Sequence, residues 1–155
     1  MTSDERATLL ARYRGGYAAF EAAMDEAKDH LDEAQDGGWT PRQVAHHLAD
    51  SEMTAAIRLR RLLAEDDPVI HAYDEEAFAR SLAYDRPTEW SLRAAEAARE
   101  TSAAILATLT EEQWQRTGTH TESGPYGVDT WLEIYAAHPY DHAAQVRTAA
   151  GIHRP

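Results

Sequence analysis

The amino-acid sequence predicts an all-α protein, a four-helix bundle formed by a single domain over residues 1–155. Ala, Glu, Leu and Arg are abundant while Val and Ile are scarce, which is typical of helical domains. Apolar side chains recur at steps of three and four along four long segments, and no repeated strand pattern accompanies them. Four such helices can bury their apolar stripes against one another.

The first helical segment is predicted over residues 4–34, where apolar side chains keep helical spacing. Ser3 or Asp4 is placed to cap its start. Gly15 and Gly16 interrupt the segment, at a cost of about 1 kcal/mol each relative to alanine. We expect either a bend or a tight helix crossing at these two glycines.

The second helix has the clearest start signal in the chain. Thr40 is the expected N-cap, Pro41 occupies the first helical position, and Gln43 completes a capping box. The helix should run to about Ala64. Its basic side chains near the C-terminal end are interpreted as a solvated face that the helix dipole favours: Arg58, Arg60 and Arg61.

The connection after the second helix is long. Residues 66–68 break the helix, and Asp74 can cap a short helix inside the connection. A third long helix follows over about residues 89–109. We therefore expect a long crossover between helices two and three that carries a short extra helix, which departs from a simple up-down-up-down bundle.

The last helix follows a turn-rich stretch, residues 118–127, which predicts a small hairpin. Asp129 is placed to cap this helix and Gly151 to end it. No further domain or internal repeat is indicated.

Charge and composition narrow the classes of function. The formal net charge is −12 at pH 7, so the surface should repel phosphate backbones and anionic membranes, and we expect no nucleic-acid or membrane partner. The chain has no cysteine, so any thiol chemistry needs a thiol brought by a second molecule. The first residues lack the pattern of a secretory signal and no apolar run could span a membrane, which favours a cytoplasmic protein.

Two histidines of the last predicted helix, His138 and His142, lie four residues apart. Positions i and i+4 lie one turn apart on one helix face, so the two imidazoles can converge on one metal ion. They also continue an inward stripe that contains Trp131 and Tyr135. The simpler alternative is a pair of core histidines without a metal, and a third ligand would distinguish the two.

The second helix offers that third ligand. His47 shares a face with Val44 and Ser51 and should point into the bundle, whereas His46 should point outward or toward a loop. An inward histidine must find a hydrogen-bond partner in the core or bind a metal. Three neutral imidazoles leave an ion's remaining positions open, as in catalytic sites, and they suit Zn²⁺ or another late divalent transition metal.

Three sequence blocks occur in an order typical of a known family: GWTPRQVAHHLADSE, PVIHAYDEEAF and HPYDH. With these blocks the chain resembles the DinB/YfiT-like superfamily of metal-binding four-helix bundles. The likeness is closest to the YfiT-like branch of metal-dependent hydrolases, which includes bacillithiol S-transferases. It covers nearly the whole chain.

The resemblance implies that His47, His138 and His142 are the metal ligands and that Zn²⁺ or Ni²⁺ is the metal. It also implies a homodimer and a reaction in which a low-molecular-weight thiol is transferred to an electrophilic substrate. Tyr73, in the loop of the second block, would line the pocket mouth. A packing tyrosine is the alternative reading of that residue.

Pro139 departs from the family pattern, because it stands inside the helix that carries two ligands. It removes the hydrogen bond to the carbonyl of Tyr135 and disfavours helical geometry at His138. We expect a kink or bulge over residues 135–139 that leaves both imidazoles pointing inward. If the helix ends at His138 instead, the two histidines diverge.

The reaction stays open at this stage. Thiol transfer is the leading hypothesis, and hydrolysis by metal-activated water or a non-catalytic binding bundle are the alternatives. Asp50 is the candidate for orienting a ligand imidazole, with Glu52 as the other acidic choice, although both suit an ordinary surface. The remaining loop and terminal histidines are expected to be solvated: His71, His120 and His153.

Overall fold

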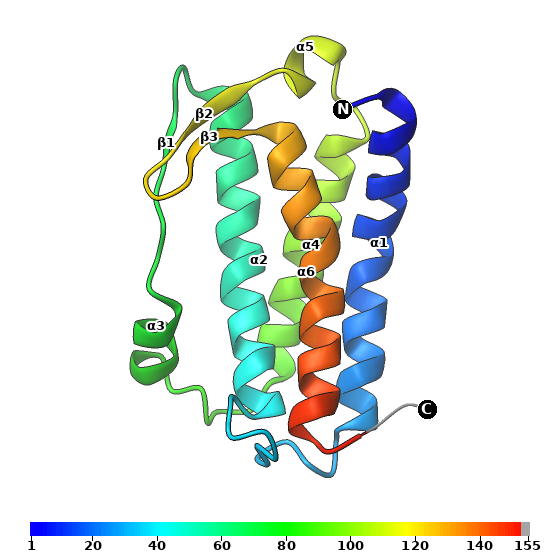
Figure 1. The fold of residues 1–155 in the computed structure, drawn as a ribbon, viewed down its shortest axis with the longest axis vertical. Helices are drawn as coiled ribbons and strands as arrows, with labels where there is room; N and C mark the ends of the chain where they lie inside the picture. Colours follow the sequence, from blue (N-terminus) through cyan, green and yellow to red (C-terminus); the bar gives the residue numbers. More distant parts are fainter. Residues whose placement is uncertain (153–155) are drawn as a thin grey trace.

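The computed structural model describes residues 1–152, so His153 lies outside the described part (Figure 1). The four long helices are α1 (Ser3–Glu26), α2 (Pro41–Ala64), α4 (Glu89–Leu106) and α6 (Val128–Ala149). The short elements are α3 (Glu75–Ser81), α5 (Glu111–Trp114), β1 (Val69–Ile70), β2 (Thr117–His120) and β3 (Gly124–Gly127).

The predicted four-helix bundle is confirmed. Helix α1 packs against α6 and α4, and α2 packs against the same two helices, so the four form a closed ring around the core. Figure 1 shows the crossover from α2 to α4, residues 65–88, as a long segment on the outside of α2 that carries β1 and α3. We call this segment the crossover strap. Among the described residues, no helix combines the length and apolar character needed to cross a membrane.

The bundle core consists of two apolar clusters with a buried polar layer between them. One cluster, around Trp131 and Leu59, lies toward the sheet; the other, around Phe20 and Leu48, lies toward the opposite end. Glu52 and Arg99 fall between the two clusters on α2 and α4, and they are only 1% and 3% exposed. The Glu52 carboxylate of this polar layer lies 3.9 Å from Nδ1 of His138.

Helix α1 differs from the prediction at both ends. Its N-cap is Thr2, whose side chain forms a capping box with Glu5, so Ser3 and Asp4 are not the cap. The helix stops at Glu26, and residues 27–34 form turns that lead across the end of the bundle to α2. Ala27 and Leu31 still pack against the core from these turns, so the stretch buries its apolar side chains without remaining helical.

The glycine pair of α1 marks a tight crossing, and the helix continues through it. A Cβ at Gly16 would lie 3.0 Å from Cγ of Pro139 and 2.8 Å from Nη2 of Arg99. A Cβ at Gly15 would lie 2.9 Å from the hydroxyl of Tyr140. At Gly16 the neighbours are the rigid ring of Pro139 and a buried guanidinium, so a side chain there would force α1 away from α6 and α4, whereas at Gly15 the tyrosine hydroxyl could move aside.

Helix α2 begins as predicted, with Thr40 as N-cap, Pro41 in the first turn and Gln43 in a capping box. The predicted solvated basic face is only partly exposed, because Arg58, Arg60 and Arg61 are all half-buried. Over Arg58 the crossover strap passes closely enough for the carbonyl of His71 to accept a hydrogen bond from Nη2 at 2.7 Å.

The predicted hairpin is present, formed by β2 and β3 in antiparallel register with Thr119 opposite Pro125. Strand β1 adds a parallel edge to β2, which was not foreseen because two residues carry no alternating pattern. Asp129 is not the cap of α6. Gly127 takes that position, and Asp129 instead pairs with Arg6 at 2.8 Å. Gly151 ends α6 as expected, with φ of +70°.

Candidate metal centre

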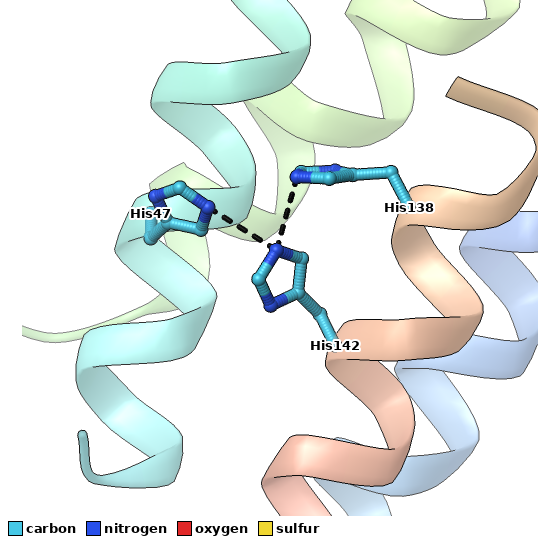
Figure 2. Close-up of side chains that lie close together, drawn as sticks. All are labelled: His47, His138 and His142. Carbon is cyan, nitrogen blue, oxygen red and sulfur yellow. Dashed lines mark hydrogen bonds between the residues drawn. The ribbon is translucent and has the colours of Figure 1, made fainter. Parts of the chain in front are cut away.

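Three histidines from two helices converge between α2 and α6. His47 projects from α2, while His138 and His142 project from successive turns of α6 (Figure 2). The Nε2 atom of His142 lies 3.2 Å from Nε2 of His47 and 3.0 Å from Nε2 of His138. One ring nitrogen from each residue lies within 4.8 Å of the other two. The structure thus brings together the three residues that the sequence nominated.

These separations fit a shared cation. Zinc–imidazole bonds of about 2.0–2.1 Å at a tetrahedral angle place two ligand nitrogens about 3.3 Å apart. Two ring nitrogens at such a distance must share a proton or a cation, because two facing lone pairs repel each other. No carboxylate or fourth imidazole from the described residues completes the group. The set of donors is therefore that of an open metal site.

The second ring nitrogen of His142 is already satisfied by the protein. Its Nδ1–H donates to Oε1 of Gln145 at 2.7 Å, which leaves the lone pair on Nε2, the atom that faces the other two histidines. His47 and His138 differ, because the Nδ1 atom of each is buried without a hydrogen-bond partner. The nearest carboxylates lie 4.0 Å and 3.9 Å away, on Glu75 and Glu52 respectively.

Burial keeps two of the three rings neutral, those of His47 and His142. Desolvation, followed by repulsion from the neighbouring imidazoles, lowers the pKa of His47 to about 3. The same two causes lower the pKa of His142 to about 4. Both rings are therefore uncharged near neutral pH and offer lone pairs, which is the form in which imidazole binds metals.

Pro139 does not disrupt the helix that carries two of these residues. Helix α6 continues from Val128 to Ala149, so it neither ends at His138 nor forms a bulge. The carbonyl of Tyr135, which the proline deprives of its helical donor, accepts hydrogen bonds from Nη1 and Nη2 of Arg99 at 3.2 and 3.3 Å. The guanidinium replaces the missing N–H, and both imidazoles keep their common face.

Arg99 connects this repair to the histidines. Its Nη1 also donates to Oε1 of Glu52 at 2.5 Å, within the buried polar layer of the core. The same Oε1 atom lies 3.9 Å from Nδ1 of His138, and the second oxygen of Glu52 is buried without a partner. A small rotation of either side chain would join the two unsatisfied groups in a hydrogen bond.

Comparison with known proteins places this arrangement in a family. A model of the DinB superfamily matches residues 12–146. The chain belongs to the DinB superfamily. It is 40% identical over 124 residues to a protein of Oceanobacillus iheyensis, covering 79% of this chain and 72% of that one. It is 37% identical over 116 residues to YfiT of Bacillus subtilis, covering 72% and 64% of the two chains.

The solved structure of YfiT matches with a TM-score of 0.88 and 29% sequence identity, covering 97% of this chain and 89% of that one. Both relatives carry the provisional name of metal-dependent hydrolase, and YfiT is described as having an unusual four-helix bundle topology. The resemblance proposed from the three sequence blocks is confirmed.

Asp50 does not take the role predicted for it. Its Oδ2 accepts a hydrogen bond of 2.6 Å from the hydroxyl of Tyr84, so the carboxylate faces the crossover strap instead of a ligand imidazole. Glu52, the other acidic choice, is the residue that approaches His138. The two carboxylates lie two positions apart on α2 and therefore point in different directions.

His46 was expected to point outward or toward a loop, and only the second alternative holds. The ring is fully buried, with Nε2–H donating to the carbonyl of Arg86 at 3.0 Å and Nδ1 accepting from Oγ of Ser91 at 2.7 Å. The chain entering α4 covers this face of α2. Sequence alone could not show that cover, because it comes from a segment 40 residues away.

Tyr73 lies in the strap, where its ring packs on that of Phe78 with centroids 4.8 Å apart. Its hydroxyl is buried and has no hydrogen-bond partner, and burial raises its pKa. Among the described residues, no hydrogen bond joins this tyrosine to the three histidines. Of the remaining histidines, His71 is exposed as expected, whereas His120 is partly buried and its ring packs on Tyr126.

Proposed function

We propose that this protein is a metal-dependent enzyme in which His47, His138 and His142 hold one divalent transition metal, Zn²⁺ or Ni²⁺. The observation that carries the proposal is the convergence of three Nε2 atoms at separations of 3.0 and 3.2 Å. The donor set supports it as well, since three neutral imidazoles suit late transition metals better than Mg²⁺ or Ca²⁺. The provisional names of the relatives agree with it.

A metal held by three imidazoles acts as a Lewis acid that lowers the pKa of a thiol or water at its open position. The chain itself orients the three rings. Gln145 fixes the tautomer of His142, and Glu52 is placed to receive the Nδ1 proton of His138. Arg99 holds Glu52 in position and keeps α6 helical at Pro139.

The reaction we propose is transfer of a low-molecular-weight thiol to an electrophilic small molecule. The thiol sulfur bonds to the electrophilic carbon as the bond between that carbon and its leaving group breaks, and the thiol proton goes to solvent or to the leaving group. Because the chain has no cysteine, the nucleophilic sulfur has to arrive with a cosubstrate. The family resemblance of the sequence blocks supports this choice. The predicted homodimer stays a prediction.

Hydrolysis is the second candidate, and the names of the relatives favour it. It needs the same three histidines and replaces the thiol with water as the nucleophile. Asp50, which is engaged by Tyr84, is not available as a base in this reaction, whereas Glu75 is half-exposed and approaches the ring of His47. The two candidates therefore differ in cosubstrate and agree in the residues that hold the metal.

One experiment separates the candidates. The purified protein is assayed with a panel of electrophiles and esters, with and without added thiol, before and after chelation and after refilling with Zn²⁺ or Ni²⁺. Thiol conjugation that is lost on chelation and restored on refilling supports the transferase. Ester cleavage without added thiol supports the hydrolase. A retained metal with no turnover of either kind would contradict an enzymatic role.

A further inference from the structure

A second polar cluster lies farther along the same face of α2. Residues 47, 51, 54 and 58 recur at helical spacing, so Arg58 lies on the face of His47 about 16 Å along the helix axis. Its Nη1 donates to the hydroxyl of Tyr135 at 3.0 Å. The ring of Tyr135 in turn lies 6.0 Å from that of His138, between centroids. One tyrosine thus separates the Arg58 guanidinium from the candidate metal centre.

The guanidinium of Arg58 has unused hydrogen-bonding capacity. Its two described bonds go to the Tyr135 hydroxyl and to the carbonyl of His71, which leaves three of the five N–H groups of an arginine free. The Nε atom is buried and has no partner. No carboxylate of the described residues forms an ion pair with this side chain, although the whole chain carries a net charge of −12.

Three phenols lie around the guanidinium: Tyr73, Tyr126 and Tyr135. The buried hydroxyl of Tyr126 lies close to Tyr135 and Arg58, and that of Tyr73 lies close to Ser51, each just outside ideal hydrogen-bond geometry. Burial raises the pKa of all three tyrosines, so each stays a neutral O–H group at physiological pH. A phenol oxygen can also accept, so the hydroxyls can satisfy one another. The guanidinium only donates, and its buried Nε–H is left without an acceptor.

A groove of about 350 Å³ reaches the side chain of Arg58 from the surface. It runs beside α2 and is lined by Arg58, His71 and the apolar side chains of Met53, Ile57 and Ile70. Met53 and Ile57 are 44% and 59% exposed, so the groove offers apolar surface next to a cation. That combination suits a small amphiphilic anion.

We propose that Arg58, held in place by the hydroxyl of Tyr135, binds the carboxylate of a small ligand whose apolar part lies in the groove. A planar carboxylate matches the fork of one guanidinium, whereas a phosphate dianion usually requires several cations. Given the proposed function, on which this step rests, the ligand is the substrate or the cosubstrate of the metal centre. The cluster would then select substrates that carry a carboxylate.

Binding of benzoate and of its neutral analogue benzamide tests the proposal by calorimetry on the full-length chain, both as purified and after chelation. Benzoate should bind at least about tenfold more tightly than benzamide in both forms. R58Q should lower the affinity for benzoate at least about tenfold. R61Q is the matched control, because Arg61 lines the same groove but already pairs with Glu65 at 2.8 Å, and its benzoate affinity should change less than about twofold.

A milder variant guards against misfolding of R58Q. R58K keeps the positive charge and loses the guanidinium fork, so its affinity for benzoate should lie between those of the wild-type chain and R58Q, with benzamide binding unchanged. Equal affinities for benzoate and benzamide, or equal effects of R58Q and R61Q, would overturn the proposal. The H47A variant separates this test from the proposed function, because it should lose the metal and still bind benzoate.

Discussion

His46 and His47 are adjacent residues of α2, but they differ in whether the protein satisfies their ring nitrogens. The protein satisfies both ring nitrogens of His46, through Ser91 and the carbonyl of Arg86. His47 has neither nitrogen satisfied in that way, because its Nδ1 lacks a partner and its Nε2 faces another imidazole. Both rings are at most 2% exposed. Burial alone therefore does not distinguish a structural histidine from a ligand.

The distinction lies in where the lone pairs point. The nitrogens of His46 face groups of the protein that can donate or accept, so that site is complete. The Nε2 atoms of His47, His138 and His142 face one another, so that site needs a cation or protons to be complete. The following predictions test this contrast, from the largest expected effect to the smallest.

Replacing His47 with alanine should abolish metal retention, because two imidazoles from one helix remain where three were needed. His46→Ala should keep one metal per chain and lose about 2–4 kcal/mol of unfolding free energy, since it empties a buried, hydrogen-bonded site. Metal analysis and denaturant titration of both variants provide the measurement. Loss of metal in H46A with retention in H47A would reverse the assignment.

Arg99→Ala tests the support behind His138. Removing the guanidinium leaves Glu52 buried without its ion-pair partner and Tyr135 without a donor for its carbonyl, which should cost about 3–5 kcal/mol of unfolding free energy. Arg93→Ala is the control on the same helix, because that residue is exposed and its pair with Glu89 should contribute less than about 1 kcal/mol. Equal effects in urea titrations would contradict the role given to the polar layer.

Glu52→Gln should weaken metal binding about 10- to 100-fold, as expected when the partner of a ligand histidine loses its charge. Asp50→Asn, two positions away on the same helix, should leave the affinity within about twofold, because Asp50 contacts Tyr84. Competition with a chromophoric chelator measures both constants on the folded variants. An effect of D50N as large as that of E52Q would restore the original prediction for Asp50.

The smallest effects should come from two substitutions that each remove one hydrogen bond to a histidine Nδ1, at His46 and at His142. Ser91→Ala removes the partner of Nδ1 in His46 and should cost about 1 kcal/mol of stability without changing metal affinity. Gln145→Ala removes the partner of Nδ1 in His142 and should lower metal affinity with less effect on the stability of the metal-free chain. The same outcome in both variants would remove the distinction between the two regions.

The features that could be predicted from the sequence depend on interactions between residues that are close together in the chain. The start of α2 was predictable because its signal consists of neighbouring residues, Thr40, Pro41 and Gln43, that bond to one another. The common face of His138 and His142 follows from helix periodicity alone. The placement of His47 opposite them required only the further step that α2 and α6 pack together.

The features that escaped prediction depend on distant segments. His46 is buried because the chain near Arg86 covers it, and Arg58 is half-buried because the strap at His71 crosses it. Arg99 gave no local signal, since an arginine on an alanine-rich helix usually lies in solvent. Its role becomes clear only when α4 places it beside the carbonyl that Pro139 frees.

The central claim is that three imidazoles share one metal ion, and X-ray absorption spectroscopy on protein purified without added metal tests it most directly. The account predicts one divalent transition metal per chain, bound to three imidazole nitrogens at about 2.0–2.1 Å, with the remaining positions taken by light atoms from solvent. A metal-free protein that fails to bind Zn²⁺ or Ni²⁺ on addition, or a metal that persists in H47A with unchanged coordination, would contradict the account.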